Sequence, residues 1–86
     1  MSSLNWGAHK TGGFAWGFSV VSDGNISFTS KDASDTDTFD EITSEKGFDL
    51  DDEYGDTLRT IDVDYSDSTT PSKVIEFTKK VLTTLS

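Results

Sequence analysis

The stretch FAWGFSVVSDGNISF, residues 14–28, decides the fold. Large apolar residues occupy every second position on both sides of its Ser-Asp-Gly turn, a period that is typical of half-buried β-strands. A three-residue loop that ends with the glycine pairs Val20 with Ile26 and Phe18 with Phe28 on one face. A two-residue Asp-Gly loop instead divides the apolar residues between the two faces. The stretch therefore predicts a hairpin with the longer loop.

Two weaker alternations flank this hairpin. Leu4, Trp6 and Ala8 predict an earlier strand, which completes a three-stranded N-terminal meander. Farther along the chain, apolar residues alternate with polar ones from Thr60 to Tyr65. That pattern predicts a later strand whose polar face carries carboxylates.

Two helices are expected in the second half of the chain. The sequence Thr-Phe-Asp-Glu that starts at Thr38 fits a capping box, which predicts that a short helix begins there. Gly47 can end this helix in the left-handed conformation. Apolar residues then recur at helical spacing over 74–85, with Thr70 as the expected cap and Pro71 in the first turn. The second pattern predicts a C-terminal amphipathic helix.

Two polar stretches show no clear period. Residues 48–56 are predicted to form an acidic loop, and the stretch from Ser30 to Thr38 is a candidate for disorder. The expected element order is β-β-β-α-β-α, an α+β fold in which a small antiparallel sheet packs on the C-terminal helix. The sheet would consist of the N-terminal meander plus the later strand. No linker or repeat divides residues 1–86, so a single domain is expected.

The composition excludes several classes of protein. The 86 residues contain no cysteine and a single histidine, so disulfide frameworks and thiolate metal sites are excluded. No stretch approaches the roughly 18 apolar residues of a membrane span, and the N-terminus lacks the pattern of a signal peptide. We therefore expect a cytoplasmic protein, in the cytoplasm of the host cell if a phage encodes it, without contact to membranes.

The charges are distributed unevenly. The formal net charge is -9, but segment 32–67 holds 14 of the 16 acidic residues against Lys46 and Arg59, a net charge of -12. The two flanking segments are mildly basic and more apolar. Because like charges gathered in one region destabilise the compact state, such a segment favours a basic partner or a cation.

Enzymatic chemistry finds little support in this sequence. The only histidine, His9, lies in a glycine-rich segment without a partner motif, which favours a surface position. A pair of carboxylates can hydrolyse glycosides, but a chain of this length leaves little room for a substrate cleft. We therefore expect a protein that is not an enzyme and that carries no cofactor.

Three other interpretations remain open. The abundant carboxylates suit a calcium-binding module, although the spacings that start at Asp49 and at Asp62 both fail the EF-hand pattern of glycine at the sixth and glutamate at the twelfth position. A small structural or assembly protein could pack copies of itself through an aromatic sheet face. A third interpretation is that the charges only keep the surface solvated, although solubility is best served by interspersed charges.

The hypothesis we favour is a small acidic inhibitor that blocks the nucleic-acid-binding surface of a basic protein. Such surfaces carry Lys and Arg that match the charge density of DNA, and rows of carboxylates can occupy them. By analogy of size and charge, this class includes anti-CRISPR and other phage anti-defence proteins and nuclease immunity proteins. The partner-binding candidates are Asp49, Asp51, Asp52, Glu53, Asp56, Asp62, Asp64 and Asp67, a second set of Asp35, Asp37 and Asp40, and Tyr54 as an aromatic anchor.

This hypothesis has consequences for the partners. The partner would be a basic nucleic-acid-binding protein or complex, and the chain itself would be a monomer or a weak homodimer. Direct binding of nucleic acid is not expected, since the net charge repels phosphate. Phe48 and Tyr65 lie beside the acidic residues, but we expect them to pack in the core rather than on a partner.

Overall fold

The structure is a computed structural model that describes residues 6–9, 16–21 and 25–85. Within these residues the elements follow the order β-β-β-α-β-β-α, an α+β fold. Their bounds are β1 Trp6–His9, β2 Trp16–Val20, β3 Ile26–Ser30, α1 Ala33–Glu45, β4 Leu50–Tyr54, β5 Leu58–Ile61 and α2 Thr70–Leu85.

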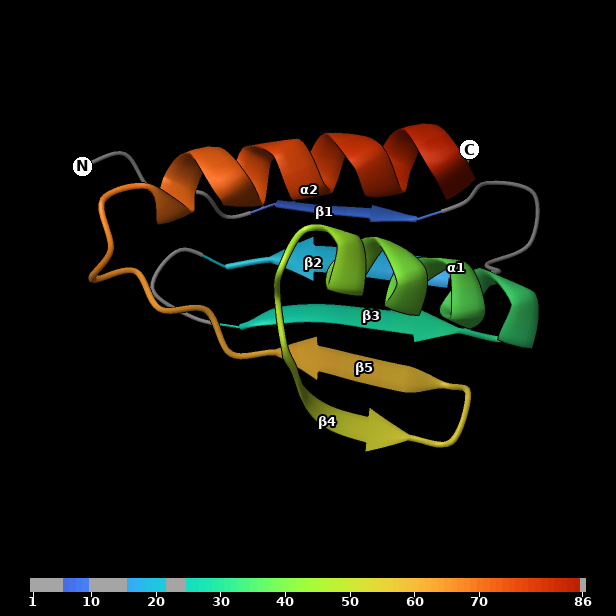
Figure 1. Ribbon diagram of the computed structural model, residues 1–86. Coiled ribbons are helices and arrows are strands. Elements are labelled where there is room, and N and C mark those ends of the chain that lie inside the picture. Colours follow the sequence, from blue (N-terminus) through green and yellow to red (C-terminus); the bar gives the residue numbers. More distant parts are fainter. Residues whose placement is uncertain (1–5, 10–15, 22–24, 86) are drawn as a thin grey trace.

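The described strands form one antiparallel sheet with the order β1-β2-β3-β5-β4. Both helices lie on the same face of this sheet, so the fold has two layers (Figure 1). The acidic elements α1 and β4 lie with β5 toward one side, whereas α2 runs along the side of β1. The fold thus preserves in space the separation of charge that the sequence shows.

The central hairpin has the predicted register. Phe18 pairs with Phe28 and Val20 pairs with Ile26, so the prediction that placed these four residues on one face is confirmed. All four are buried. The predicted meander is confirmed by the pairing of β1 with β2. Leu4, the turn at 22–24 and the side chain of His9, on which other predictions fell, lie outside the described residues.

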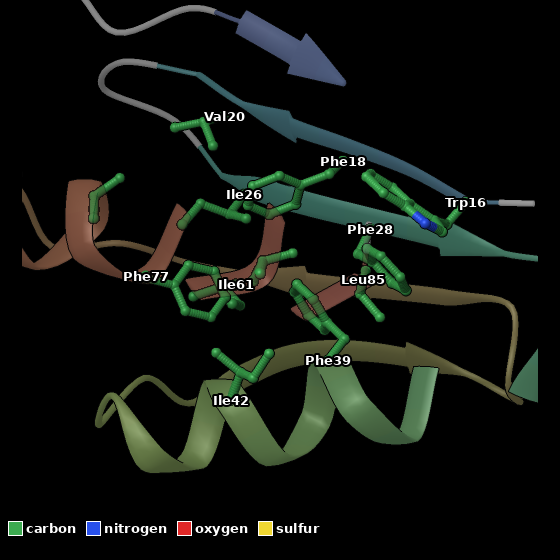
Figure 2. Close-up of a cluster of buried hydrophobic side chains, with 12 residues drawn as sticks. Trp16, Phe18, Val20, Ile26, Phe28, Phe39, Ile42, Ile61, Phe77 and Leu85 are labelled. Atoms are coloured by element: carbon green, nitrogen blue, oxygen red, sulfur yellow. The ribbon is translucent and has the colours of Figure 1, made fainter. Parts of the chain in front are cut away.

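The core lies between the sheet and the two helices (Figure 2). Phe39 of α1 occupies its centre: its ring stacks on Phe28 with 4.4 Å between centroids and meets Phe18 and Phe77 edge-on. Aromatic rings prefer these offset and edge-to-face arrangements. The aromatic side chains of β2 and β3 are therefore covered by helices and are not exposed on a free sheet face.

Helix α1 begins earlier than predicted. Asp32 is its N-cap, with the carboxylate accepting hydrogen bonds from the Ser34 amide at 3.0 Å and the Ser34 hydroxyl at 2.8 Å. The capping box at Thr38 is therefore wrong, because Thr38 lies inside the helix and donates to the Ser34 carbonyl. The candidate disorder of 30–38 is wrong as well, since Thr36 is fully buried.

Helix α1 ends as predicted. Gly47 follows the C-cap residue with a φ of 81°, a conformation that glycine adopts without steric cost. The Gly47 amide donates to the Ser44 carbonyl, and the Phe48 amide donates to the Thr43 carbonyl. These two bonds form a Schellman motif, which turns the chain toward β4.

Segment 48–56 is not a loop. It contains β4, which pairs with β5 through a turn at Gly55, where φ is 55°. Strand β5 ends at Ile61, so the predicted strand that reached Tyr65 is too long. Val63 and Tyr65 nevertheless pack on the core from the connection that follows. The alternating apolar residues thus all face the core, but only those up to Ile61 belong to a paired strand.

Helix α2 confirms the predicted amphipathic helix and buries Val74, Phe77 and Val81. Pro71 lies in its first turn, as predicted. Thr70 is the first helical residue rather than the cap, since its hydroxyl donates to the Asp64 carbonyl at 2.8 Å. Among the described residues, neither helix is long and apolar enough to cross a membrane.

Candidate acidic binding site

An acidic groove of about 400 Å³ lies between the C-terminal half of α1 and β4. Three carboxylates line it: Asp40 from α1, Asp49 from the connection after Gly47, and Glu53 from β4. The Schellman motif at the end of α1 brings the connection back over the helix end, which places Asp49 beside the other two. Residues that are 13 positions apart in the sequence thus share one depression.

A second groove, of about 210 Å³, adjoins the first. The two share Gly47, Phe48 and Asp49 as lining residues. We call the pair the acidic grooves, and their carboxylates are Asp40, Asp49, Glu53, Asp62, Asp64 and Asp67. Lys73 of α2 contributes a cation to the second groove, and its Nζ lies 5.5 Å from the centre of the Phe48 ring.

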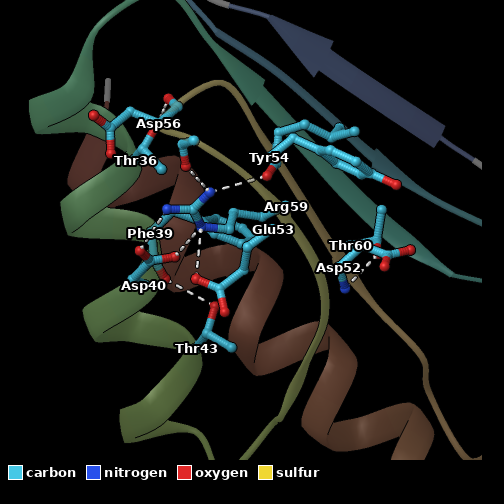
Figure 3. Close-up of polar contacts among 12 residues, drawn as sticks. Thr36, Phe39, Asp40, Thr43, Asp52, Glu53, Tyr54, Asp56, Arg59 and Thr60 are labelled. Carbon is cyan, nitrogen blue, oxygen red and sulfur yellow. Dashed lines mark hydrogen bonds and ion pairs between the residues drawn. The ribbon is translucent and has the colours of Figure 1, made fainter.

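Arg59 holds the first groove in shape (Figure 3). Its side chain is only 6% exposed and forms a bidentate pair with Asp40, with Nε at 2.9 Å from one carboxylate oxygen and Nη2 at 3.2 Å from the other. The hydrogen bond to Asp40 is the main reason that the pKa of Arg59 is raised. A second carboxylate, on Glu53, lies 3.8 Å from Nε.

The guanidinium also fixes the β4–β5 turn. Its Nη1 donates to the backbone carbonyls of Gly55 and Leu58, the latter at 3.0 Å. The Thr36 hydroxyl of α1 donates to the Asp56 carbonyl in the same turn at 2.7 Å. Helix α1 and the hairpin are therefore joined at two points, which sets the width of the first groove.

Asp64 and Asp67 lie in the connection before α2 and have the same local geometry. The Asp64 carboxylate accepts from the Ser66 hydroxyl at 2.6 Å and from the Ser66 amide at 3.0 Å. The Asp67 carboxylate accepts from the Thr69 amide and the Thr69 hydroxyl, both at 2.8 Å. These bonds favour the ionised forms and lower the pKa of both groups. Both carboxylates therefore remain ionised to a lower pH than an ordinary aspartate does.

Removing the hydroxyls is expected to raise these two pKa values unequally. The hydroxyl of Ser66 is the largest cause of the lowered pKa of Asp64, whereas for Asp67 the Thr69 amide comes first. Ser66→Ala should therefore remove the largest cause of the lowered pKa of Asp64, whereas Thr69→Ala leaves the largest cause at Asp67 in place. Carboxyl-detected NMR titration measures both.

Each of these two variants is the control for the other, because neither touches the other carboxylate. A lowered carboxyl pKa stabilises the fold above the ordinary pKa, 3.8, and this contribution disappears as the pH falls through the lowered value. In both variants the folded-state pKa lies closer to 3.8, so stability above that pH should fall and the loss of stability on acidification should become smaller. Unchanged titration of Asp64 in Ser66→Ala would contradict the assignment.

The remaining predicted residues do not line the grooves. Asp35 lies in the first turn of α1, where a carboxylate also stabilises the helix dipole, and Asp37 is exposed on the next turn. Asp51 and Asp52 are exposed on β4, at its bulge, and Asp56 is exposed in the turn that follows.

One prediction about side-chain placement is wrong. Asp62 and Asp64 do not project from one face of a strand, because β5 has ended before them. Tyr54 is 59% exposed but pairs with Leu58, and so lies on the sheet face opposite to Arg59 and the grooves. Tyr54 therefore lies outside the acidic grooves, and its role as an aromatic anchor for a partner stays a prediction.

Two acidic residues of the same surface are missing from the predicted set. Glu41 and Glu45 are exposed on α1 and continue from Asp37 at a spacing of four residues. Residues at this spacing are neighbours on a helix surface, about 6 Å apart along the axis. We call Asp37, Glu41 and Glu45 the acidic stripe. A helix start at Asp32 rather than Thr38 reveals the stripe in the sequence.

Two aromatic side chains near the grooves pack as expected. Phe48 and Tyr65 are half-buried against the core, and Phe48 meets Phe77 edge-on at 5.2 Å between centroids. Within the described part of the chain, no three carboxylates are grouped closely enough to hold a metal ion. The observed arrangement is one of separated, exposed carboxylates along grooves and a helix.

The chain was compared with models of known protein families, with curated proteins and with solved structures. None of the three comparisons finds a match.

Proposed function

We propose that this protein binds the nucleic-acid-binding surface of a basic protein and blocks it. The observation that carries the proposal is the set of exposed carboxylates around two adjoining grooves, Asp49, Glu53, Asp62, Asp64 and Asp67, together with the exposed acidic stripe on α1. Of the two cations in segment 32–67, Arg59 is buried and already paired with Asp40. The surface therefore presents negative charge that a basic partner can neutralise.

The charge has a cost that binding would relieve. Carboxylates of the acidic stripe lie at a spacing at which like charges destabilise a helix. Within the described residues, Asp37, Glu41 and Glu45 form no ion pair. Proteins that bind nucleic acid carry Lys and Arg that neutralise phosphates. The same cations can pair with the carboxylates of the acidic stripe. Attraction between such surfaces also raises association rates at low salt.

Protection of a sheet edge is a competing explanation for part of this charge. β4 is the last strand of the sheet, and charged residues on such strands prevent pairing with other chains. This role accounts for Asp51 and Asp52, which lie on β4 itself. It does not account for Asp49, for Asp62 or for the acidic stripe, which lie on other elements.

The test is a variant with four charges removed: Asp37→Asn, Glu41→Gln, Asp49→Asn and Asp62→Asn. These exposed side chains form no hydrogen bond or ion pair within the described residues, so the fold should remain. The immobilised protein is exposed to nuclease-treated lysate at about 50 and about 500 mM salt, since exposed charges are screened at the higher value. We expect a basic protein to be retained by the unchanged chain at low salt and lost with the variant.

The control variant is Lys79→Gln with Lys80→Gln, which alters exposed charges on α2 away from the grooves. It should retain the captured protein, and a DNA duplex should compete for that protein with the immobilised chain. The four-charge variant should also melt at a higher temperature than the unchanged protein, because repulsion is relieved. Equal retention by both variants, or no competition by DNA, would overturn the proposal.

A further inference from the structure

β4 is an open edge of the sheet, since its described pairing is with β5 alone. The Asp52 amide donates to the Thr60 hydroxyl at 3.1 Å, and the Tyr54 carbonyl accepts from the Thr57 amide, so both groups point toward β5. Backbone groups of successive residues in a strand point to opposite sides. The amide and carbonyl of Glu53, between them, therefore point away from the sheet and can pair with another strand.

The side chains of β4 decide which kind of strand can approach this edge. Asp51, Asp52 and Glu53 are exposed and successive, so they carry negative charge on both faces of the edge. A second copy of this chain is repelled, because like charges opposite each other destabilise strand pairing. An extended basic segment is attracted, since its side chains would lie within about 5.5 Å of the β4 side chains.

The two faces of the edge offer different contacts to such a segment. Glu53 pairs across the sheet with Arg59, so it lies on the helix side and lines the first acidic groove. Asp52 and the exposed Tyr54 pair with Thr60 and Leu58, and the Tyr54 ring can accept a cation on the outer side. A basic side chain on either face of the added strand therefore meets a carboxylate.

We infer that an extended basic segment of the partner adds to the sheet as a strand beside β4. This inference rests on the proposed function and names the element that the partner contributes. Main-chain hydrogen bonds would supply affinity in this mode, and the alternate side chains would supply specificity. Glu53 is its central residue, because its backbone groups face the free edge and its carboxylate faces the groove.

Two peptides of equal charge test the inference with the full chain. The first is an eight-residue peptide of alternating Lys and Val, which can form a strand. The second alternates Lys and Pro, which keeps the charge but removes half of the amide donors and favours the polyproline II conformation. Titrations are followed by amide NMR spectra at about 50 mM salt, where charge attraction is strong. We expect the Lys-Val peptide to bind at least ten-fold more tightly and to slow hydrogen exchange of the Glu53 amide.

Glu53→Pro and Glu53→Gln form a matched pair of variants. Both remove the carboxylate, but only proline removes the outward amide, and proline is tolerated on edge strands where the amide faces solvent. Glu53→Gln should lower the affinity for the Lys-Val peptide a few-fold. Glu53→Pro should abolish the preference for the Lys-Val peptide over the Lys-Pro peptide. If Glu53→Pro does not fold, the two peptides on the unchanged chain still decide.

The outcomes separate this inference from the proposed function. Equal binding of both peptides, binding of neither, or equal affinities of the two Glu53 variants would overturn strand addition. The four-charge variant tests the other proposal in the same assay. If it binds both peptides as tightly as the unchanged chain, the acidic surface is not the recognition element and the proposed function fails. If the four-charge variant binds both peptides more weakly by the same factor while Glu53→Pro changes neither affinity, the proposed function stands without strand addition.

Discussion

Arg59→Met is expected to lower the free energy of unfolding by about 3 kcal/mol. The guanidinium is buried and donates to Asp40, Gly55 and Leu58, so its removal leaves a carboxylate and two backbone carbonyls without their donor. Methionine keeps most of the buried aliphatic stem, so the loss reports on the polar contacts. Because the Asp40 side chain is 30% exposed, water can solvate it in part, which places the loss at the lower end for a broken buried pair. Denaturant unfolding measures the difference.

A double-mutant cycle separates the ion pair from the turn contacts. Asp40→Leu with Arg59→Met replaces both partners by apolar groups, and for a buried pair this restores much of the lost stability. The two Arg59 carbonyl contacts remain broken, so the restoration should be incomplete. Additive effects of the two substitutions would show that Asp40 and Arg59 are not coupled in the folded protein.

The elements that could be predicted from the sequence are those in which one local pattern is sufficient. The hairpin of β2 and β3 follows from alternation, because only one register buries Phe18, Phe28 and their neighbours together. Helix α2 follows from the helical spacing of residues that include Val74 and Phe77, which the sheet then covers.

The elements that could not be predicted depend on distant contacts. The first turns of α1 are polar in sequence, and their burial comes from Thr36, whose hydroxyl reaches the turn after β4. β4 itself consists largely of carboxylates, which have a low strand propensity. Its pairing is stabilised by Arg59, and no periodicity in the sequence predicts that this arginine is buried. Such a strand can be predicted only when the position of its pairing strand, β5, is already known.

The candidate site could likewise be predicted from the sequence only in part. The sequence shows that acidic residues are concentrated in one segment, but their grouping depends on the connection that Gly47 allows. That turn brings Asp49 to both grooves, where it joins Asp40 on one side and Asp62 on the other. Asp40, from the second predicted set of carboxylates, thus lies beside Asp49 and Glu53 from the first set. The acidic stripe was missed because the capping box at Thr38 assigned Glu41 to the helix start and left Asp37 outside the helix.

The second large effect is expected for Phe39→Ala, which should cost about 4 kcal/mol of stability. Phe39 is fully buried and contacts three other rings, so its removal leaves a cavity that rigid aromatic neighbours cannot fill. Small domains are only marginally stable, so this variant should be largely unfolded near body temperature. Thermal unfolding followed by circular dichroism measures the loss.

The effect on function should follow from the effect on α1. Phe39 precedes Asp40 and lies in the same helix as the acidic stripe, so loosening its packing releases α1 from the sheet and widens the first groove. Phe39→Leu keeps part of the volume and should cost less, while Tyr54→Ala, on the exposed outer face, should change stability by no more than about 0.5 kcal/mol. If Phe39→Ala were as stable as Tyr54→Ala, the stacked rings at the centre of this core would not hold α1 in place. The carboxylates of α1 and β4 would then have no fixed geometry to present to a partner.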